Sequence, residues 1–493
     1  MSLIKINNVS FSYDGSNEIF KKLSFHIDSS WRLGFIGRNG KGKTTFLKLL
    51  MNEYEYSGSI QSNEIFTYFP NSLDNKNLET RNLIVQINEE IQEWELIREL
   101  SYLNINEEVL NRNFLSLSPG EQTKVLLAVL FLKEYTFLLI DEVTNHLDSE
   151  GRQLVAKYLK SKQGFILVSH DRSFIDECVD HVLVMNKSKI EVLNGNFSSW
   201  WSNKQKQDQS EINENIRLKK DMRRLKEGAE RLNLWSDKIE ASKFGQGPVD
   251  RGFIGAKSAS MMKRAKNVEK RFEKNYEDKK QLLKDVEEVA PLKLSPLKYT
   301  SKKYVELENV ACYYDQQINA PVSFVVEEGD RIALCGSNGC GKTTIIKLIH
   351  RENIKYTGRL YENDRLIISY LTQDTSTLKG KLDDFIYQEG LDISLFKAIL
   401  RKLDFSRLQF EKRLEDYSDG QKKKVLIAKS LCEKAHLYIW DEPLNYIDVF
   451  SRMQIEDLLM DFKGTMIFVE HDQTFSNKIA TRKININKAE TNH

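Results

Sequence analysis

The sequence predicts an α/β protein in which one domain is duplicated in tandem, with a long α-helical hairpin between the copies. Gly37-Arg-Asn-Gly-Lys-Gly-Lys-Thr-Thr45 recurs 299 residues later as Gly336-Ser-Asn-Gly-Cys-Gly-Lys-Thr-Thr344. Asp141-Glu142 recurs 300 residues on, and His170-Asp171 recurs 301 residues on. Residues 202–300 match neither copy. Nearly constant offsets over such distances indicate a duplicated domain and a separate joining element.

The composition favours a globular chain that works under reducing conditions. Of 493 residues, 40% are apolar and 29% are charged, and no window reaches the run of about 20 apolar residues that a membrane span needs. The sequence begins directly with the alternating pattern of a strand, Met1-Ser-Leu-Ile-Lys-Ile, so no signal peptide is expected. The five cysteines are odd in number and lack paired spacing, which predicts neither disulfides nor zinc sites. The sequence thus predicts a cytoplasmic protein.

The first copy begins with two segments, Leu3–Phe11 and Phe20–Ile27, in which apolar and polar residues alternate. This alternation is typical of antiparallel strands. Residues 31–36 form a short apolar strand that leads into the glycine loop, and residues 44–50 open a helix. This order predicts a phosphate site, because backbone N–H groups of the loop close around phosphates at the helix N-terminus. Lys43 is expected to reach the β- and γ-phosphates, and the Thr44 hydroxyl to bind Mg²⁺.

Two carboxylates end the next apolar strand, Phe137-Leu-Leu-Ile-Asp-Glu142. Asp141 is placed to hold Mg²⁺, directly or through water, and Glu142 to polarise an attacking water. A strand end that caps a helix would explain one such pair, but not its recurrence in Tyr438-Ile-Trp-Asp-Glu442. Ile166-Leu-Val-Ser-His170 places a histidine at the carboxyl edge of the sheet, where ligands bind in α/β folds.

Leu117-Ser-Pro-Gly-Glu-Gln-Thr-Lys-Val125, followed by a helical pattern at residues 126–132, completes a set of motifs that resembles the ATP-binding cassette (ABC) superfamily. Residues 118–121 are similar to its signature motif, and residues 141–148 to its Walker B motif and D-loop. His170 is similar to the switch histidine, and Tyr13 to the aromatic residue that stacks on adenine. The resemblance implies two ABC-type P-loop nucleotide-binding domains that use ATP and Mg²⁺. It also implies head-to-tail pairing, with each ATP between one glycine loop and the opposite signature.

The resemblance assigns site residues in both copies. The catalytic residues are Glu142, Glu442, His170 and His471. The nucleotide-binding residues are Tyr13, Gly37, Asn39, Gly40, Gly42, Lys43, Thr44, Thr45, Ser118, Gly120, Tyr314, Gly336, Asn338, Gly339, Gly341, Lys342, Thr343, Thr344, Ser418 and Gly420. The metal-binding residues are Thr44, Asp141, Thr343, Gln373 and Asp441. Head-to-tail pairing would join Lys43 to Ser418 in one site and Lys342 to Ser118 in the other.

Four positions depart from the superfamily pattern. Asn71 stands where the second copy has a glutamine, and Val143 where it has a proline. Pro119 and Asp419 each replace the first glycine of the signature, and Asp419 adds a negative charge near the γ-phosphate unless it points away. Because both lysines, both glutamates and both histidines are kept, we expect two hydrolytic sites of unequal rate.

The joining segment, residues 202–300, has the pattern of a helical hairpin. From Lys204 to Lys243, apolar residues recur at spacings of three and four, which predicts one stripe of a helix about 60 Å long. Residues 244–255 contain four glycines and a proline and break it, and a second helical pattern runs from about residue 256 to Pro291. Residues 201–300 carry 24 Lys and Arg against 16 Asp and Glu. This positive charge fits a polyanion partner and a solvated, lysine-rich hairpin about equally well.

A tandem cassette pair with such a hairpin and no membrane span resembles the ABC-F family of translation factors, and above all its antibiotic-resistance branch, typified by Lsa and Vga proteins. The likeness covers nearly the whole chain and includes Trp440-Asp-Glu-Pro-Leu-Asn-Tyr446 and Glu470-His-Asp472. It implies binding to the E site of the 70S ribosome, with the hairpin on 23S rRNA beside the P-site tRNA and the basic run 262–271 on RNA phosphates. Residues that could touch rRNA or a drug at the tip, about 243–257, are Lys243, Phe244, Val249, Arg251, Phe253, Ile254 and Lys257, although packing of the turn explains any one of them equally well.

The resemblance therefore implies a monomeric, cytoplasmic, ribosome-associated protein with domains at 1–201, 202–300 and 301–493. It would displace lincosamide, streptogramin A or pleuromutilin antibiotics by ATP-driven ribosome protection. A housekeeping ABC-F factor that rescues stalled ribosomes is the first alternative. An efflux-transporter ATPase would need membrane-domain partners, which the polar hairpin has no obvious way to couple to. A DNA-repair type of ATPase comes last, and no DNA partner is expected.

Overall fold

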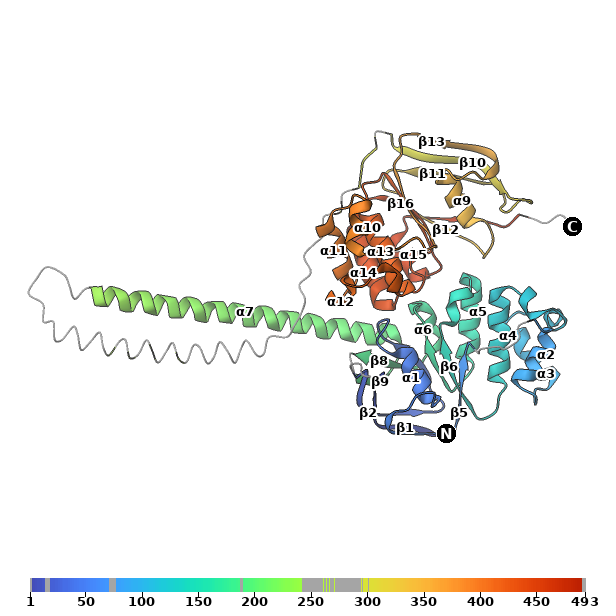
Figure 1. The fold of residues 1–493 in the computed structure, drawn as a ribbon, viewed down its shortest axis with the longest axis horizontal. Coiled ribbons are helices and arrows are strands. Elements are labelled where there is room, and N and C mark those ends of the chain that lie inside the picture. The colour runs from blue at the N-terminus through green and yellow to red at the C-terminus, as the bar shows by residue number, and fades with distance from the viewer. Residues whose placement is uncertain are drawn as a thin grey trace, which may run out of the picture. The chain divides into compact units, whose positions relative to one another are not determined.

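The computed structural model describes residues 2–13, 18–70, 77–186, 189–241, 296–299 and 301–489, with the single positions 260, 263, 266, 270 and 294. The chain divides into two compact units. The first unit, Met1–Ser198 with Pro291–His493, contains both copies of the duplicated domain, and the second is Ser199–Ala290. Figure 1 labels the elements of both.

The first copy contains two sheets in its described part. A three-stranded antiparallel sheet has the order β2-β1-β4, and a six-stranded sheet has the order β5-β6-β7-β3-β8-β9. In the larger sheet only β9 runs antiparallel to its neighbour. The strands are β1 (Leu3–Phe11), β2 (Phe20–Asp28), β3 (Arg32–Ile36), β4 (Ser57–Gln61), β5 (Ile65–Phe69), β6 (Thr136–Asp141), β7 (Phe165–Val168), β8 (His181–Asn186) and β9 (Lys189–Asn194). The helices are α1 (Lys43–Leu50), α2 (Thr80–Ile87), α3 (Glu93–Tyr102), α4 (Pro119–Phe131), α5 (Ser149–Lys160) and α6 (Arg172–Cys178).

The second copy repeats this plan. Its antiparallel sheet has the order β11-β10-β13, and its parallel sheet the order β14-β15-β16-β12-β17. The strands are β10 (Lys303–Tyr313), β11 (Val322–Glu327), β12 (Arg331–Cys335), β13 (Lys355–Glu362), β14 (Ile368–Leu371), β15 (Leu437–Asp441), β16 (Thr465–Val469) and β17 (Arg482–Asn485). The helices are α9 (Lys342–Ile349), α10 (Leu382–Gln388), α11 (Ile393–Lys402), α12 (Arg407–Phe410), α13 (Asp419–Cys432), α14 (Val449–Asp461) and α15 (Gln473–Ile479).

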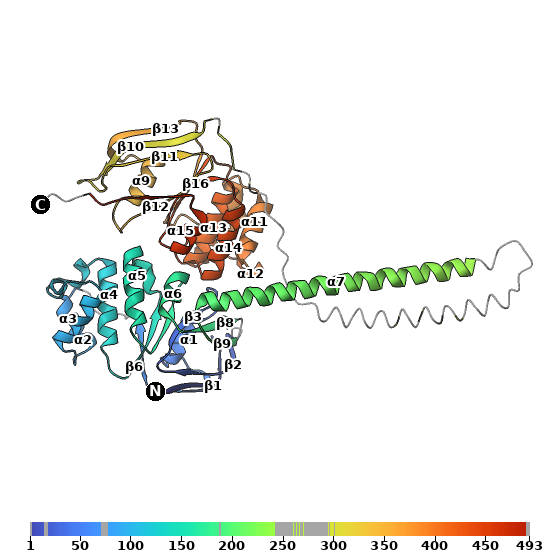
Figure 2. The same ribbon diagram turned by 180° about the vertical axis from the view of Figure 1, so that it is seen from behind.

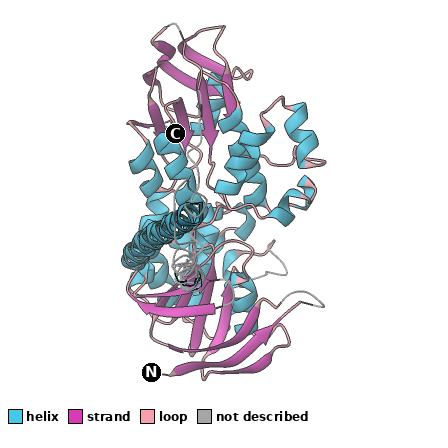
Figure 3. Cartoon of the chain, turned by 90° about the vertical axis from the view of Figure 1, so that its left-hand side faces the viewer, coloured by secondary structure: helices cyan, strands magenta, loops and turns pink. Residues whose placement is uncertain are grey.

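The helix after each glycine loop fills the space between the two sheets of its copy. In the second copy, α9 lies between the antiparallel sheet and the parallel strands, and Figures 2 and 3 show this layering. Ile345 and Ile346 of α9 join one core with Leu307 of β10 and Ile467 of β16. The parallel strands β6, β7, β15 and β16 are continuous apolar runs, as expected for strands covered on both faces. This packing confirms the predicted α/β fold and fixes the glycine loop at the carboxyl edge of the sheet.

The helix α4 begins seven residues earlier than its apolar pattern predicts, at Pro119 instead of Leu126. Its N-cap Ser118 accepts a hydrogen bond from Glu121 N, while the Glu121 side chain accepts from Ser118 N. Such a capping box stabilises a helix start without apolar residues, and proline suits the first helical position. The cap formed by Ser118 therefore defines where this helix starts, and Pro119 is compatible with its first position.

The helix α7 (Phe197–Ala241) accounts for the first half of the predicted hairpin. At 45 residues it is about 68 Å long, and it begins seven residues before the predicted start at Lys204. The Ser198 backbone N–H donates to Asp176 Oδ1 at 2.9 Å, which satisfies one of the unpaired groups at the start of the helix. The predicted break at residues 244–255 lies outside the described residues. Within the described residues, no helix is long and apolar enough to cross a membrane.

Candidate nucleotide-binding and catalytic sites

Each glycine loop ends in a left-handed glycine that serves as the N-cap of the following helix. The φ angle is 105° at Gly42 and 97° at Gly341, a region that favours glycine. A Cβ atom on Gly42 would lie 2.8 Å from Ile19 Cγ2, so a larger residue is also excluded by contact. The left-handed backbone explains why both loops need glycine directly before the lysine, and the close contact strengthens this requirement at Gly42.

The lysine head group of each loop is enclosed by backbone carbonyls. Lys43 Nζ donates to Gly37 O at 2.7 Å, and Lys342 Nζ donates to Gly336 O at 2.8 Å. Burial lowers the pKa of Lys43, while nearby carboxylates, including Asp141, raise it. A cation buried in this way, at the N-terminus of a helix, provides the charge and the N–H groups that a polyphosphate requires.

The aspartates that end β6 and β15 lie beside the hydroxyl groups that follow the lysines. Thr44 Oγ1 donates to Asp141 Oδ2 at 3.0 Å, and Thr343 Oγ1 donates to Asp441 Oδ1 at 3.3 Å. Gln373 Nε2 also donates to Asp441 Oδ1 at 3.3 Å. Burial, followed by repulsion from its glutamate neighbour, raises the pKa of Asp441 to about 6.

A magnesium ion fits this arrangement at the second copy. The Oδ2 atom of Asp441 is buried and has no hydrogen-bond partner among the described residues. A buried carboxylate oxygen without a donor is costly unless a cation is bound to it. Hydroxyl, carboxylate and amide oxygens are also the hard ligands that Mg²⁺ prefers. Thr343, Gln373 and Asp441 would hold the ion here, and Thr44 and Asp141 would do so in the first copy.

The glutamates that follow the aspartates have strained backbones and fixed side chains. Glu142 and Glu442 have φ angles of 55° and 47°, which non-glycine residues seldom adopt. His170 Nε2 lies 3.1 Å from Glu142 Oε1, and Asn145 Nδ2 donates to Glu142 Oε2 at 2.7 Å. Although burial acts in the opposite direction, the nearby His170 and the hydrogen bond from Asn145 bring the pKa of Glu142 down to about 2. The carboxylate is therefore ionised at neutral pH, as a group that accepts a proton from water must be.

The second glutamate is held by the equivalent pair of residues. His471 Nε2 lies 3.6 Å from Glu442 Oε1, and Asn445 Nδ2 donates to Glu442 Oε2 at 2.6 Å. Although burial again raises it, the nearby His471 and the hydrogen bond from Asn445 lower the pKa of Glu442. Both copies thus place an ionised glutamate between a histidine and an asparagine.

Contacts between the copies bring each glycine loop to the D-loop of the other copy. Asn39 Nδ2 donates to Tyr446 O at 2.8 Å, and Asp148 Oδ2 accepts from the Asn338 backbone N–H at 3.5 Å. A Cβ atom on Gly420 would lie 2.4 Å from Tyr446 O and 3.5 Å from Asn39 Nδ2. The second signature therefore lies against the first glycine loop, which is the head-to-tail pairing that the resemblance implies.

Both signature serines are helix N-caps. Ser418 accepts from Gln421 N at the start of α13, just as Ser118 does from Glu121 N at the start of α4. Asp419 occupies the first position of α13 and is exposed, where the helix dipole favours a negative charge. This placement gives Asp419 a structural role at the helix start.

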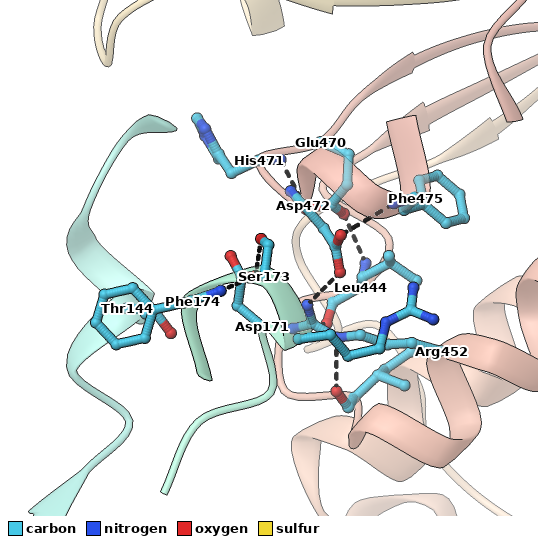
Figure 4. Close-up of polar contacts among 12 residues, drawn as sticks. Thr144, Asp171, Ser173, Phe174, Leu444, Arg452, Glu470, His471, Asp472 and Phe475 are labelled. Atoms are coloured by element: carbon cyan, nitrogen blue, oxygen red, sulfur yellow. Dashed lines mark hydrogen bonds and ion pairs between the residues drawn. The ribbon is translucent and has the colours of Figure 1, made fainter. Parts of the chain in front are cut away.

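A buried cluster of ion pairs lies where α6 and α15 meet, and Figure 4 shows Asp171, Arg452 and Asp472 of this cluster. Arg152 Nη1 donates to Asp171 Oδ2 at 3.0 Å, and Arg452 Nη1 donates to Asp472 Oδ2 at 3.1 Å. Both aspartates are N-caps, of α6 and α15 respectively. The residues directly after the two histidines therefore fix the helices at the junction between the copies.

The predicted adenine-stacking tyrosines have unequal surroundings. The Tyr13 hydroxyl is 2.9 Å from Thr45 Oγ1, and the Tyr13 ring lies edge-on to Phe11 and Tyr54. The Tyr314 side chain is 60% exposed. Asn71 and the predicted tip residues Lys243, Phe244, Val249, Arg251, Phe253, Ile254 and Lys257 lie outside the described residues.

Four residues at these sites escaped the sequence analysis. Asn145 and Asn445 each follow a glutamate by three residues, and this repeat could have revealed them. Lys423 Nζ donates to Thr372 O at 3.0 Å near Asp441, but the first copy has a threonine at the matching position. Tyr68 donates to Asp141 from a strand that lies far away in the sequence, so no local pattern indicated it.

Comparisons with known proteins agree with this geometry. The family described as ABC transporter matches residues 20–145 and 320–445. The ribosome protection protein VmlR of Bacillus subtilis (strain 168) is 27% identical over 496 residues, which span 98% of this chain and 86% of that protein. The ATP-binding protein Uup of Buchnera aphidicola subsp. Acyrthosiphon pisum (strain APS) is 30% identical, over 98% of this chain and 80% of Uup.

Solved structures share the fold. The archaeal ribosome recycling factor aABCE1, crystallised with the ribosomal stalk protein aP1, has a TM-score of 0.63 at 18% identity, over 97% of this chain and 87% of that one.

A protein described as an ABC transporter F family member, from Arabidopsis thaliana, is 23% identical over 98% of this chain. With two cassette matches and relatives along nearly its whole length, the chain belongs to the ABC-F family of ATP-binding cassette proteins and is an ATPase.

Proposed function

We propose that this protein is a ribosome-protection factor that acts in the cytoplasm. It binds the ribosomal E site with ATP between its cassettes, and its hairpin displaces lincosamide, streptogramin A or pleuromutilin drugs from the peptidyl-transferase centre. The observation that carries the proposal is the likeness to the ribosome protection protein VmlR over 98% of this chain, which includes the hairpin.

The described residues of the hairpin support an RNA partner. Ser260, Lys263, Lys266 and Lys270 are helical and exposed. Spacings of three and four place these three lysines on one face of a helix. Exposed lysines aligned in this way match the phosphate groups of 23S rRNA or P-site tRNA, which bind basic side chains by charge.

The site geometry supports a switch that ATP closes. The side chains of Lys43 and Lys342 bind the phosphates, while the signature residues Ser418 and Ser118 approach from the opposite copy. ATP then stabilises the paired state, because it contacts both copies at once. Bound Mg²⁺ supplies positive charge to the β- and γ-phosphates. Glu142 and Glu442 each orient a water and accept its proton, with His170 and His471 holding them in place.

A drug-release assay tests this function. Ribosomes loaded with a radiolabelled lincosamide are mixed with ATP and the Glu142→Gln/Glu442→Gln variant, which binds ATP without cleaving it. We expect the amount of retained drug to fall at least tenfold. The Lys43→Ala/Lys342→Ala variant, which lacks the phosphate-binding ammonium groups, is expected to release none. Full retention of the drug on ribosomes that carry the first variant would refute drug displacement.

A housekeeping role is the second candidate, because the chain is also 30% identical to Uup, which is described as an ATP-binding protein and not as a ribosome protection protein. In that case the chain would bind ribosomes in the same assay and leave the drug in place. Translation of a stalling messenger RNA, measured with and without the protein, would then show a higher yield of full-length product.

A further inference from the structure

The glycine loop of the first copy makes a charged contact with the second copy that the loop motif itself does not require. Arg38 follows Gly37 at a variable position of that motif, and its guanidinium forms an ion pair with the carboxylate of Asp404. The same guanidinium lies over the Phe450 ring of α14, with Arg38 Cζ 6.0 Å from the ring centroid. Both partners belong to the second copy. Arg38 therefore bridges the two copies directly beside the loop that is expected to bind phosphate.

Asp404 is held firmly in the second copy. It lies two residues after α11, has a φ angle of 69°, and donates its backbone N–H to a carbonyl of the last turn of that helix at 3.0 Å. Lys424 Nζ of α13 donates to the neighbouring Leu403 carbonyl at 2.9 Å and lies 3.8 Å from Asp448 Oδ2. The helix α13 is the one that Ser418 caps. The partner of Arg38 is thus tied to the helix that carries the second signature.

The matching interface, between the second glycine loop and the first copy, cannot form this pair. The positions that correspond to Arg38, Asp404 and Phe450 hold, in the same order, a serine, an asparagine and a glutamate, which are Ser337, Asn104 and Glu150. Asn104 keeps the left-handed backbone, with a φ angle of 51°, so the turn is preserved and the charge is missing. Only the first of the two interfaces therefore has the residues for an ion pair and a cation–π contact at these positions.

The second interface also contains a cavity of about 260 Å³. Residues of both copies line it, among them Ser149 and Arg152 of α5 and His471 and Gln473 of the second copy. Gln473 Nε2 donates to Ser149 Oγ at 2.8 Å, a hydrogen bond between uncharged groups. Because side chains that line a cavity have no contacts across it, the copies are held less firmly at this interface.

We propose that the Arg38–Asp404 pair keeps the first nucleotide site, built on Lys43, closed for longer than the second, built on Lys342. Each nucleotide is released only when the glycine loop beside it separates from the signature helix of the other copy. At the first site this separation breaks an ion pair and a cation–π contact, and at the second site it breaks neither. Arg38 is thus a positioning residue, and the second site opens first. This inference rests on the nucleotide sites and the cassette pairing of the proposed function.

The test measures nucleotide release from one site at a time in the full-length chain. Lys342→Ala leaves only the first site able to hold nucleotide, and Lys43→Ala leaves only the second. Both parents carry Glu142→Gln/Glu442→Gln, so that the nucleotide is not cleaved. Each variant is loaded with Mg²⁺ and the fluorescent ATP analogue mant-ATP and then mixed with excess ATP in a stopped-flow instrument. The rate constant of release is recorded at low and at high salt.

In the first-site background, Asp404→Asn is expected to speed release about threefold, because it removes the ion pair. Arg38→Ser also removes the contact with the Phe450 ring and is expected to speed release about tenfold. Arg38→Ser/Asp404→Asn should match Arg38→Ser alone, since neither charge contributes without the other. The Arg38 side chain is 45% exposed, so dissolved salt reaches the pair. High salt should therefore speed release from the parent and leave Asp404→Asn unchanged.

The second-site background provides the matched controls. Asp404→Asn and Arg38→Ser are expected to change release from the second site less than twofold. Ser337→Arg/Asn104→Asp transfers the charge pair to the matching interface and is expected to slow release from the second site about threefold. A change in folding alone would not produce opposite effects from removing the pair at one site and adding it at the other.

Two kinds of outcome overturn the proposal in distinguishable ways. If both parents bind mant-ATP but Arg38→Ser and Asp404→Asn leave first-site release unchanged, or speed release equally from both sites, the pair does not favour the first site, and the nucleotide sites stand. If neither parent binds mant-ATP, the proposed nucleotide sites are wrong, and the role of the pair fails with them. Thermal unfolding of each variant confirms that it is folded before release is measured.

Discussion

At the scale of single residues, the two glutamates that we propose to be catalytic have neighbouring side chains at both of their oxygens. In each copy a histidine lies next to Oε1, and an asparagine donates to Oε2. Glu142 and Glu442 also have a left-handed backbone, which restricts the directions in which each carboxylate can point. The asparagines therefore help to hold the carboxylates that we propose accept a proton from water.

Removing both asparagines should slow hydrolysis without weakening ATP binding. Asn145→Ala/Asn445→Ala frees Oε2 of each glutamate, and a base displaced from its water loses about 10- to 100-fold in rate. Steady-state ATPase assays should show this fall in kcat, while fluorescent-nucleotide titration should give an unchanged Kd. Asn106→Ala, which removes a helix cap at the surface, is the control and should leave both unchanged. An unaltered kcat in the double variant would show that the asparagines do not orient the base.

At the residue scale, the sequence supports a prediction best where the chemistry is local. The glycine loop, the lysine and the threonine lie within nine consecutive residues, so their spacing alone indicated the phosphate site. Tyr68 and Asp141 are 73 residues apart and meet only because β5 pairs with β6. No periodicity encodes that contact, so only the folded chain could show it.

At the scale of secondary-structure elements, α6 and α14 are joined by an ion pair that has no counterpart on the other side of the duplication. Arg172 of α6 donates to the buried carboxylate of Glu456 on α14, and Lys478 Nζ donates to the other oxygen of Glu456 at 3.2 Å. The matching positions are Gln473 and Ala156, and Gln473 Nε2 donates to Ser149 Oγ at 2.8 Å instead. The junction between the copies is thus asymmetric in its charges.

Breaking this pair should destabilise the cassette unit. Glu456→Ala leaves the Arg172 guanidinium buried without its partner, which typically costs about 3–5 kcal/mol. Arg172→Gln/Glu456→Ala reproduces the glutamine and alanine found at the matching positions, and it should recover all but about 1 kcal/mol. Urea unfolding, followed by tryptophan fluorescence, measures the free energy in both variants. A double variant no more stable than Glu456→Ala would contradict the role assigned to the buried charge.

Apolar patterns and the glycine loop predicted β1, β2, β3 and α1 to within one residue at each end, and the failures elsewhere have physical causes. β1 starts and ends where its alternating pattern does. α4 and α7 begin earlier than their apolar stripes because polar caps, Ser118 with Glu121 and the contact of Ser198 with Asp176, start a helix before its buried face begins. A pattern of buried residues cannot report such caps.

At the scale of the whole molecule, the duplication explains how one chain contains two sites. Contacts such as those of Asn39 with Tyr446 and Asp148 with Asn338 join parts of the chain that no local motif connects, and only the family resemblance anticipated them. The ATPase activity follows from the family, whereas the action on the ribosome is our central proposal, which the likeness to the ribosome protection protein VmlR supports. A ribosome factor of this kind should bind its target only while ATP pairs the cassettes.

The measurement that tests this claim most directly is co-sedimentation of the Glu142→Gln/Glu442→Gln variant with 70S ribosomes, with and without ATP. Loss of the two carboxylates should trap the paired, ATP-bound state without impairing ATP binding. We predict at least tenfold more protein in the ribosome pellet with ATP than without it, and no enrichment for Lys43→Ala/Lys342→Ala. Equal amounts in the pellet with and without ATP, in a variant shown to bind ATP, would contradict the account and direct attention to membranes or DNA.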